Sequence, residues 1–152
     1  MIDSNPGSDD WQPGYAVWAA AVYSGAVVGS GAASWLSPLV APRTAGWGFP
    51  ALFGLLGREG SSGPALYLSV AMIMVLISVL PGLLSLFLIS LTEIRLAVHP
   101  AVGAAFFAVS AGWVGQSLGG AVFGFVFGLA SLGTIALLLG LRRRIDLSRN
   151  RG

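Results

Sequence analysis

The sequence predicts an all-α membrane protein in which four transmembrane helices form one bundle. Only 9% of the residues are charged and 55% are hydrophobic, whereas about 25% of the residues in an ordinary soluble domain are charged. The mean hydropathy of +0.82 agrees, because lipid accepts an apolar surface that water does not. Three stretches without an ionised side chain are each long enough to cross a bilayer. We therefore expect lipid to be the solvent of most of the chain.

The first predicted span covers residues 15–36, inside the charge-free stretch between Asp10 and Arg43. Before it, residues 1–14 contain three acidic residues and no basic residue. A cleavable signal peptide begins with a positively charged region. We therefore expect the first apolar segment to remain in the mature protein and residues 1–14 to form a cytoplasmic tail.

The second predicted span covers residues 65–91 and contains Pro81. Proline has no N–H to donate to the carbonyl of Ile77, four residues earlier, so the sequence predicts a kink at Pro81. A nearby serine, Ser78 or Ser85, is expected to satisfy that carbonyl. The small residues of this span fall seven apart and predict a packing seam, which consists of Ala71, Ser78, Ser85 and Thr92.

Between these spans lies a predicted outer loop, residues 37–63. It contains an apolar block, Phe49 to Leu56, that is too short to cross a bilayer. Two arrangements fit such a block: a helix that lies flat in the membrane interface, or a re-entrant segment that lines a cavity. The flat arrangement is favoured.

The last charge-free stretch, Leu96 to Leu141, is too long for one crossing and fits two helices joined by a short turn. The turn is predicted at Val114 to Gly120, where glycine and polar residues gather. Spans over residues 100–115 and 120–141 then form a tight helical hairpin. Together with the earlier spans they complete a single transmembrane domain, residues 15–141.

The arginines predict the orientation, because basic residues concentrate in cytoplasmic segments. Four spans place six of the eight basic residues on the side of the two termini, and only Arg43 and Arg58 on the other side. Both termini are therefore expected in the cytoplasm, in a plasma membrane such as a bacterial inner membrane. The basic tail, residues 142–152, contains Arg142, Arg143, Arg144, Arg149 and Arg151. Clustered beside a span, these arginines are typical of a membrane anchor and not of a nucleic-acid-binding face.

Small residues at four-residue spacing predict close helix packing, because in lipid helices associate through close contact of their backbones. Such ridges occur in the first, third and fourth spans. The predicted packing interface consists of Ala21, Gly25, Gly29 and Ala33 in the first span and Gly120, Gly124 and Gly128 in the fourth; the third span offers Ala104, Ala108 and Gly112. These ridges either hold one bundle together, which is favoured, or face another subunit.

Reactive groups are few. The chain has no cysteine and one histidine, which excludes thiolate chemistry and leaves one chain unable to supply a two-histidine haem site or a closed metal site. The densest polar group lies between the second and third spans and gives one weak candidate site: Glu93, Arg95 and His99. Solvated loop charges are the favoured interpretation. No catalytic, cofactor-binding or metal-ligating residue is predicted.

The predicted spans carry many packing ridges and no ionised group, and both observations favour a non-catalytic function. We expect an accessory, assembly or stabilising subunit of a larger membrane complex, whose partners are the lipid bilayer and other membrane subunits or further copies of itself. The alternative is a small homo-oligomeric transporter or channel component, with Pro81, Gln116 and the block from Phe49 to Leu56 beside a polar path.

Overall fold

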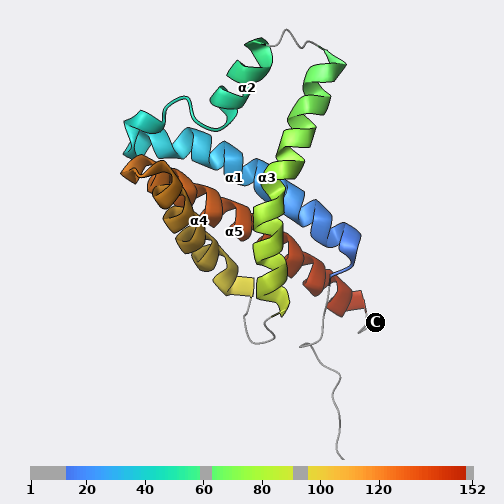
Figure 1. Ribbon diagram of the computed structural model, residues 1–152. Coiled ribbons are helices and arrows are strands. Elements are labelled where there is room, and N and C mark those ends of the chain that lie inside the picture. Colours follow the sequence, from blue (N-terminus) through green and yellow to red (C-terminus); the bar gives the residue numbers. More distant parts are fainter. Residues whose placement is uncertain (1–12, 59–62, 91–95, 150–152) are drawn as a thin grey trace, which may run out of the picture.

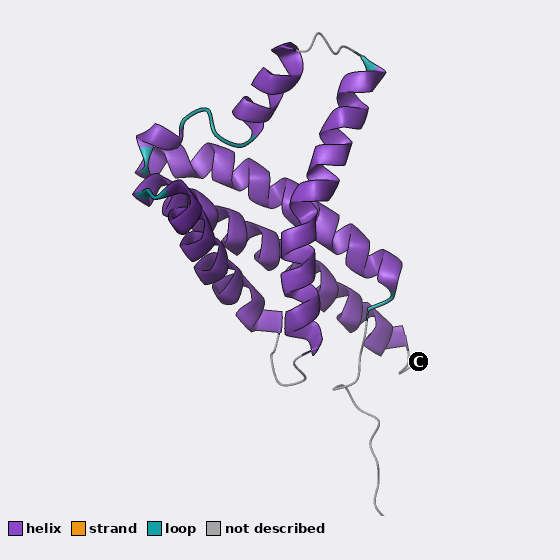
Figure 2. Ribbon diagram, viewed as in Figure 1, coloured by secondary structure: helices purple, strands orange, loops and turns teal. Residues whose placement is uncertain are grey.

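All the secondary structure in the described part of the chain is helical (Figures 1 and 2). The computed structural model describes residues 13–58, 63–90 and 96–149. In chain order the elements are α1 (Tyr15–Val40), η1 (Pro42–Thr44), α2 (Phe49–Arg58), α3 (Pro64–Ser90), η2 (Leu96–Val98), α4 (His99–Gly115) and α5 (Leu118–Arg149). The predicted all-α class is confirmed. The described residues form five α-helices and not the four of the predicted bundle, because the apolar block of the outer loop also folds as a helix, α2.

Three of these helices are long and apolar enough to cross a membrane: α1, α3 and α5, with 26, 27 and 32 residues. At 1.5 Å per residue they are about 39 to 48 Å long, which exceeds the roughly 30 Å hydrocarbon core of a bilayer. They indicate an integral membrane protein. The remaining long helix, α4, has 17 residues and is about 25 Å long, somewhat shorter than that core.

The first helix extends beyond its predicted end at Leu36, through Pro38, to Val40. Two buried hydroxyl groups stabilise this end. The Ser37 hydroxyl donates to the carbonyl of Ala33 and lies 3.0 Å from the Thr44 hydroxyl in η1. The chain after α1 is thereby folded back onto the helix that it leaves.

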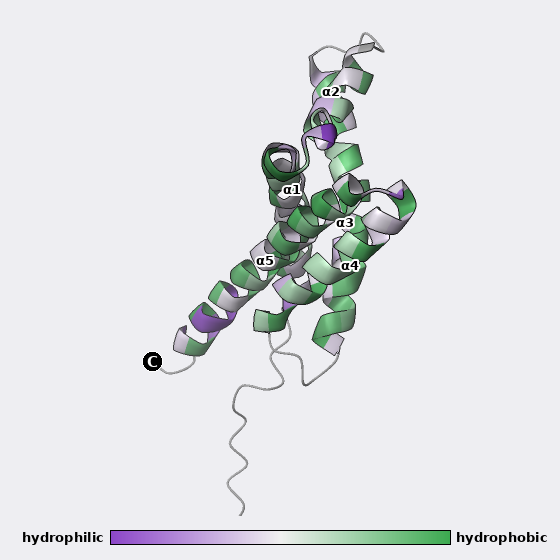
Figure 3. Ribbon diagram, turned by 90° about the vertical axis from the view of Figure 1, so that its left-hand side faces the viewer, coloured by the Kyte–Doolittle hydropathy of each residue, from purple (hydrophilic) through white to green (hydrophobic). Residues whose placement is uncertain are grey.

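The last helix continues through most of the predicted basic tail and ends at Arg149. Arg142 and Asp146 are four residues apart, and the Arg142 Nε lies 3.2 Å from a carboxylate oxygen of Asp146. Such a pair stabilises an exposed helix by a few tenths of a kcal/mol. Figure 3 shows this hydrophilic turn near the C-terminal end of α5, beyond the apolar surface of the helix.

The main core is built around α5, which packs against α1 on one side and α4 on another. Leu132, Ile135 and Leu139 of α5 are fully buried there. A second, smaller cluster joins α2 to α3 through Leu52, Leu56 and Met74. In Figure 1, α3 crosses α1, and its upper part extends away from α4 and α5 toward α2.

Helix α3 continues through Pro81, which is fully buried. Neither serine that was expected to satisfy the carbonyl of Ile77 does so. The Ser78 hydroxyl donates to the carbonyl of Val75, and the buried Ser85 hydroxyl has no hydrogen-bond partner among the described residues. That prediction is therefore wrong, whereas the kink itself stays a prediction.

The packing seam of α3 also differs from the predicted one. Ser85 is buried, but Ala71 and Ser78 are only half-buried, and Thr92 lies outside the described residues. The difference follows from the crossing of α3 and α1, which brings one stretch of α3 against α1 instead of its whole length. The buried positions of α3 are Met74, Pro81, Gly82, Ser85 and Leu88.

Candidate functional site

The closest helix contact in the described residues joins α4 to α5. A Cβ atom on Gly124 would collide with the carbonyl oxygen of Phe107, and one on Gly128 would collide with that of Gly103. One on Gly120 would lie 2.6 Å from the carbonyl oxygen of Ala111. No real Cβ atom approaches a carbonyl so closely, so glycine is required at each of the three positions.

These contacts repeat every four residues on both helices, because α4 and α5 run antiparallel and each presents one face. Gly103, Phe107 and Ala111 of α4 lie opposite Gly128, Gly124 and Gly120 of α5, respectively. The small residues predicted for the third span also face α5: Ala104 is buried, and a Cβ atom on Gly112 would lie 3.0 Å from the Cβ atom of Ala121. Sequence spacing identified this face of α4 but not the backbone carbonyls that come closest.

The ridge of α1 packs on a different face of α5. A Cβ atom on Gly25 would lie 2.7 Å from the carbonyl oxygen of Ser131 and from a side-chain carbon of Ile135. One on Gly29 would lie 2.8 Å from the Cβ atom of Ser131 and 2.9 Å from the carbonyl oxygen of Phe127. The glycines of α1 thus allow it to approach the backbone of α5.

All seven predicted interface residues are buried inside this chain. Ala21 and Ala33 lie in the main core together with Phe107 and Phe127, whose rings meet edge to face at 4.9 Å. The ridges of α1 and α5 therefore hold the described helices together, and their glycines are not available to another subunit.

The connection between α1 and α2 is tied back onto α1. The backbone N–H of Phe49, at the start of α2, donates to the Ser34 hydroxyl at 2.9 Å. Gly48 precedes it with φ of +70°, and a Cβ atom there would collide with the same hydroxyl. On the other side, Trp47 packs edge to face on Phe123 of α5 at 5.9 Å. The connection is therefore fixed to both helices.

Of the weak polar site, only one residue can be described. Glu93 and Arg95 lie outside the described residues. His99 is the first residue of α4 and is fully buried. The described residues contain no group of three His, Cys, Asp or Glu side chains that could hold a metal ion.

The residues that were expected to border a polar path lie in different parts of the molecule. Pro81 is buried in the seam of α3. Gln116 is exposed at the turn between α4 and α5, with φ of 42°. The block from Phe49 to Leu56 belongs to α2 and packs on Met74. The structure does not bring these three together.

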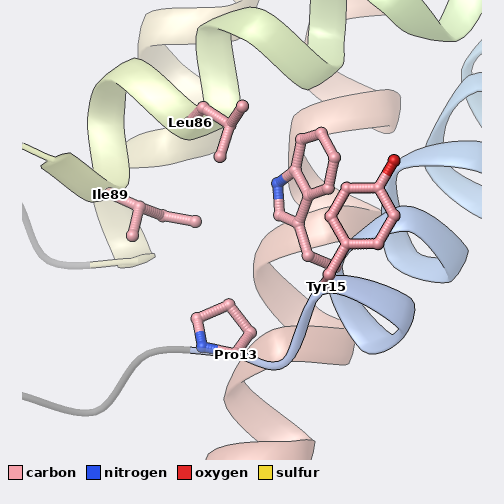
Figure 4. Close-up of a pocket in the computed structure, with 5 residues that line it drawn as sticks. Pro13, Tyr15, Leu86 and Ile89 are labelled. Atoms are coloured by element: carbon pink, nitrogen blue, oxygen red, sulfur yellow. The ribbon is translucent and has the colours of Figure 1, made fainter.

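A pocket of about 240 Å³ lies between the start of α1 and the end of α3. Its lining is mainly apolar and consists of Pro13, Tyr15, Trp18, Leu86 and Ile89. In Figure 4, Leu86 and Ile89 of α3 face the side of the pocket formed by Pro13 and the start of α1. The Nε1 atom of Trp18 is buried and has no hydrogen-bond partner among the described residues. Sequence reasoning did not find the pocket, because its other wall comes from a distant helix.

The described part of the chain is all-helical, three of its helices indicate an integral membrane protein, and α1, α4 and α5 pack through glycine ridges. No protein-family model, curated protein or solved structure matches this chain.

Proposed function

We propose that this chain is a non-catalytic integral membrane protein that acts as an accessory, assembly or stabilising subunit of a larger membrane complex. The observation that supports it best is the position of α3. This helix meets α1 along one seam, and its other faces carry large exposed apolar side chains, among them Leu76, Leu80 and Phe87. The glycine ridges, in contrast, are all used within the chain.

The proposal places the partner on the outer face of α3. Leu76 and Leu80 are 69% and 57% exposed, and they lie four residues apart on one helical face. Its own chain contacts α3 on one side only, and a partner helix that covers this face would complete the packing of α3. The alternative, a homo-oligomeric transporter or channel component, has less support because the residues proposed to border its polar path lie apart.

The proposal includes a four-span topology with both termini in the cytoplasm. Helix α4 is then the third crossing, and its length of about 25 Å requires local thinning of the bilayer or entry of its ends into the interface. The exposed turn between α4 and α5 lies outside the cell in this topology. Four arginines near the end of α5, Arg142, Arg143, Arg144 and Arg149, favour the cytoplasmic side for that end.

Cysteine labelling tests the topology, because the chain has no cysteine of its own. We expect single cysteines at Gly57 and Leu118 to react with a membrane-impermeant maleimide in intact cells, and one at Ser148 to react only after permeabilisation. Labelling of the Leu118→Cys variant only after permeabilisation would contradict the proposed crossing by α4.

Site-specific photo-crosslinking tests the proposed partner surface. A benzophenone amino acid at position 76 or 80 is expected to crosslink a membrane protein that co-purifies in fixed stoichiometry and becomes less abundant when this chain is deleted. Val109 of α4, which is 71% exposed, provides the matched control position and is expected to crosslink only lipid. A protein that always migrates alone as a monomer after mild extraction, with lipid adducts only, contradicts the proposal.

A further inference from the structure

The pocket lies between the start of α1 and the end of α3, and in Figure 1 the end of α5 lies on the same side of the molecule. Helices α1 and α5 run antiparallel, and Gly25 of α1 lies against Ile135 of α5. Trp18 precedes Gly25 by seven residues and Arg142 follows Ile135 by seven. Equal steps of about 1.5 Å per residue along antiparallel helices bring Trp18 and Arg142 to similar depth. The pocket beside Trp18 and the arginine-rich end of α5 therefore lie at similar depth.

The pocket combines an apolar lining with one unused hydrogen-bond donor. Leu86 and Ile89 of α3 provide one apolar wall, and the rings of Tyr15 and Trp18 are 5.9 Å apart on the opposite side. A buried donor without an acceptor lowers the free energy of unfolding. An acceptor supplied by a ligand would remove that cost for Trp18 Nε1.

The charges at the depth of the pocket indicate which ligand fits. The last turns of α5 carry Arg142, Arg143, Arg144 and Arg149 against one acid, Asp146. A guanidinium group binds phosphate oxygens with two parallel hydrogen bonds. A phospholipid offers a phosphate for the arginines, an ester carbonyl for the indole N–H and an acyl chain for the apolar wall.

We propose that this pocket is a binding site for an anionic phospholipid. The lipid phosphate pairs with the arginines at the end of α5, with Arg142 foremost. An ester carbonyl accepts a hydrogen bond from Trp18 Nε1, and the upper part of an acyl chain lies on Leu86 and Ile89. The site does not depend on the proposed subunit function, since it needs only this chain and a bilayer.

Native mass spectrometry of the full chain in detergent, titrated with phosphatidylglycerol or phosphatidylcholine, tests the proposal. We expect the first bound phosphatidylglycerol to have the lower dissociation constant. Trp18→Phe removes the donor and keeps a ring, so it is expected to weaken this binding about two- to tenfold. Arg142→Gln is expected to weaken it about fivefold, the usual effect of one basic residue near anionic lipid. Leu86→Trp fills the pocket and is expected to reduce binding further.

Each variant has a matched control elsewhere on the chain. Trp113→Phe replaces an exposed tryptophan at the far end of α4, Leu83→Trp enlarges an exposed leucine of α3 outside the pocket, and Arg43→Gln removes an exposed arginine of η1. All three are expected to bind phosphatidylglycerol like the unmodified chain. Thermal unfolding in detergent without lipid identifies variants that fail to fold.

Two results would overturn the site. Equal dissociation constants for the two lipids would remove the anionic preference. A loss of binding in Arg142→Gln but not in Trp18→Phe or Leu86→Trp would show that headgroups meet the arginines alone and that the pocket is not involved.

Discussion

Gly103 of α4 and Gly128 of α5 face each other so closely that a Cβ atom on either residue would collide with the carbonyl oxygen of the other. The relationship is reciprocal and lies near the start of α4. At such a separation the Cα–H groups are also close to the facing carbonyls, and contacts of this kind contribute about 0.5–1 kcal/mol each. The hairpin of α4 and α5 is therefore held mainly by backbone approach, and any side chain at these two positions separates the helices.

Substitution of Gly128 by alanine is expected to destabilise the fold by about 1–3 kcal/mol, the usual cost of inserting a carbon atom into a well-packed core. Gly133 lies in the same helix, but a Cβ atom there would meet nothing closer than 3.8 Å. Gly133→Ala is therefore expected to be neutral or to stabilise by up to about 1 kcal/mol through helix propensity. Unfolding by SDS in mixed micelles measures both variants. Equal loss of stability would contradict the close approach.

Ser131→Ala is expected to raise the free energy of unfolding by about 1 kcal/mol. The Ser131 hydroxyl is fully buried against α1 and has no hydrogen-bond partner among the described residues. Its removal therefore also removes the cost of burying an unpaired polar group. Ser37 provides the contrast, because its buried hydroxyl bonds to Ala33 and Thr44. Ser37→Ala is expected to cost about 1 kcal/mol in the same SDS titration. A loss of stability in Ser131→Ala would show that this hydroxyl has a partner.

Ser34→Ala is expected to loosen the start of α2 without unfolding the rest. It removes the acceptor of the Phe49 N–H, and loss of a helix-capping oxygen typically costs about 1 kcal/mol. Hydrogen–deuterium exchange of the α2 amides should become about fivefold faster. Ser78→Ala serves as control, since that hydroxyl bonds only to the carbonyl of Val75 in its own helix. Unchanged exchange in α2 would mean that the connection is held by Trp47 alone.

Gln116→Gly is expected to stabilise the chain by about 1 kcal/mol. Gln116 ends α4 with φ of 42° and ψ of 37°, a left-handed conformation that costs residues with a Cβ atom about 1–2 kcal/mol and glycine nothing. Gln116→Ala keeps the Cβ atom and is expected to leave the melting temperature nearly unchanged. A melting temperature that falls in Gln116→Gly would show that the glutamine side chain makes a stabilising contact.

The sequence was sufficient to predict the elements whose cause is local. Charge-free stretches predicted α1, α3 and α5 because an ionised group in hydrocarbon is costly, and the Gly-Gln-Ser segment predicted the turn after Gly115 because it combines flexible and polar residues. Spacing of small residues likewise identified Gly25, Gly29 and the glycines of α5 as packing positions. Each of these signals lies within one segment of the chain.

Features that depend on two distant segments were missed. The seam of α3 was placed on Ala71, Ser78, Ser85 and Thr92. Of these the structure buries Ser85, and the crossing with α1 also buries Met74, Pro81 and Leu88. The pocket beside Trp18 was also not predicted, because Leu86 and Ile89 reach it from another helix. Neither the crossing position nor the relative rotation of two apolar helices is encoded in hydropathy, since lipid and a neighbouring helix are equally apolar.

The central position of α5 has a consequence for biosynthesis. Because α1 leaves the ribosome before its main docking surface on α5, around Ser131 and Ile135, its glycines stay uncovered while the helices between the two are synthesised. During that interval the face of α1 that carries its glycines is exposed to other helices in the membrane. A nascent chain that stalls before Leu118 would leave this face of α1 uncovered.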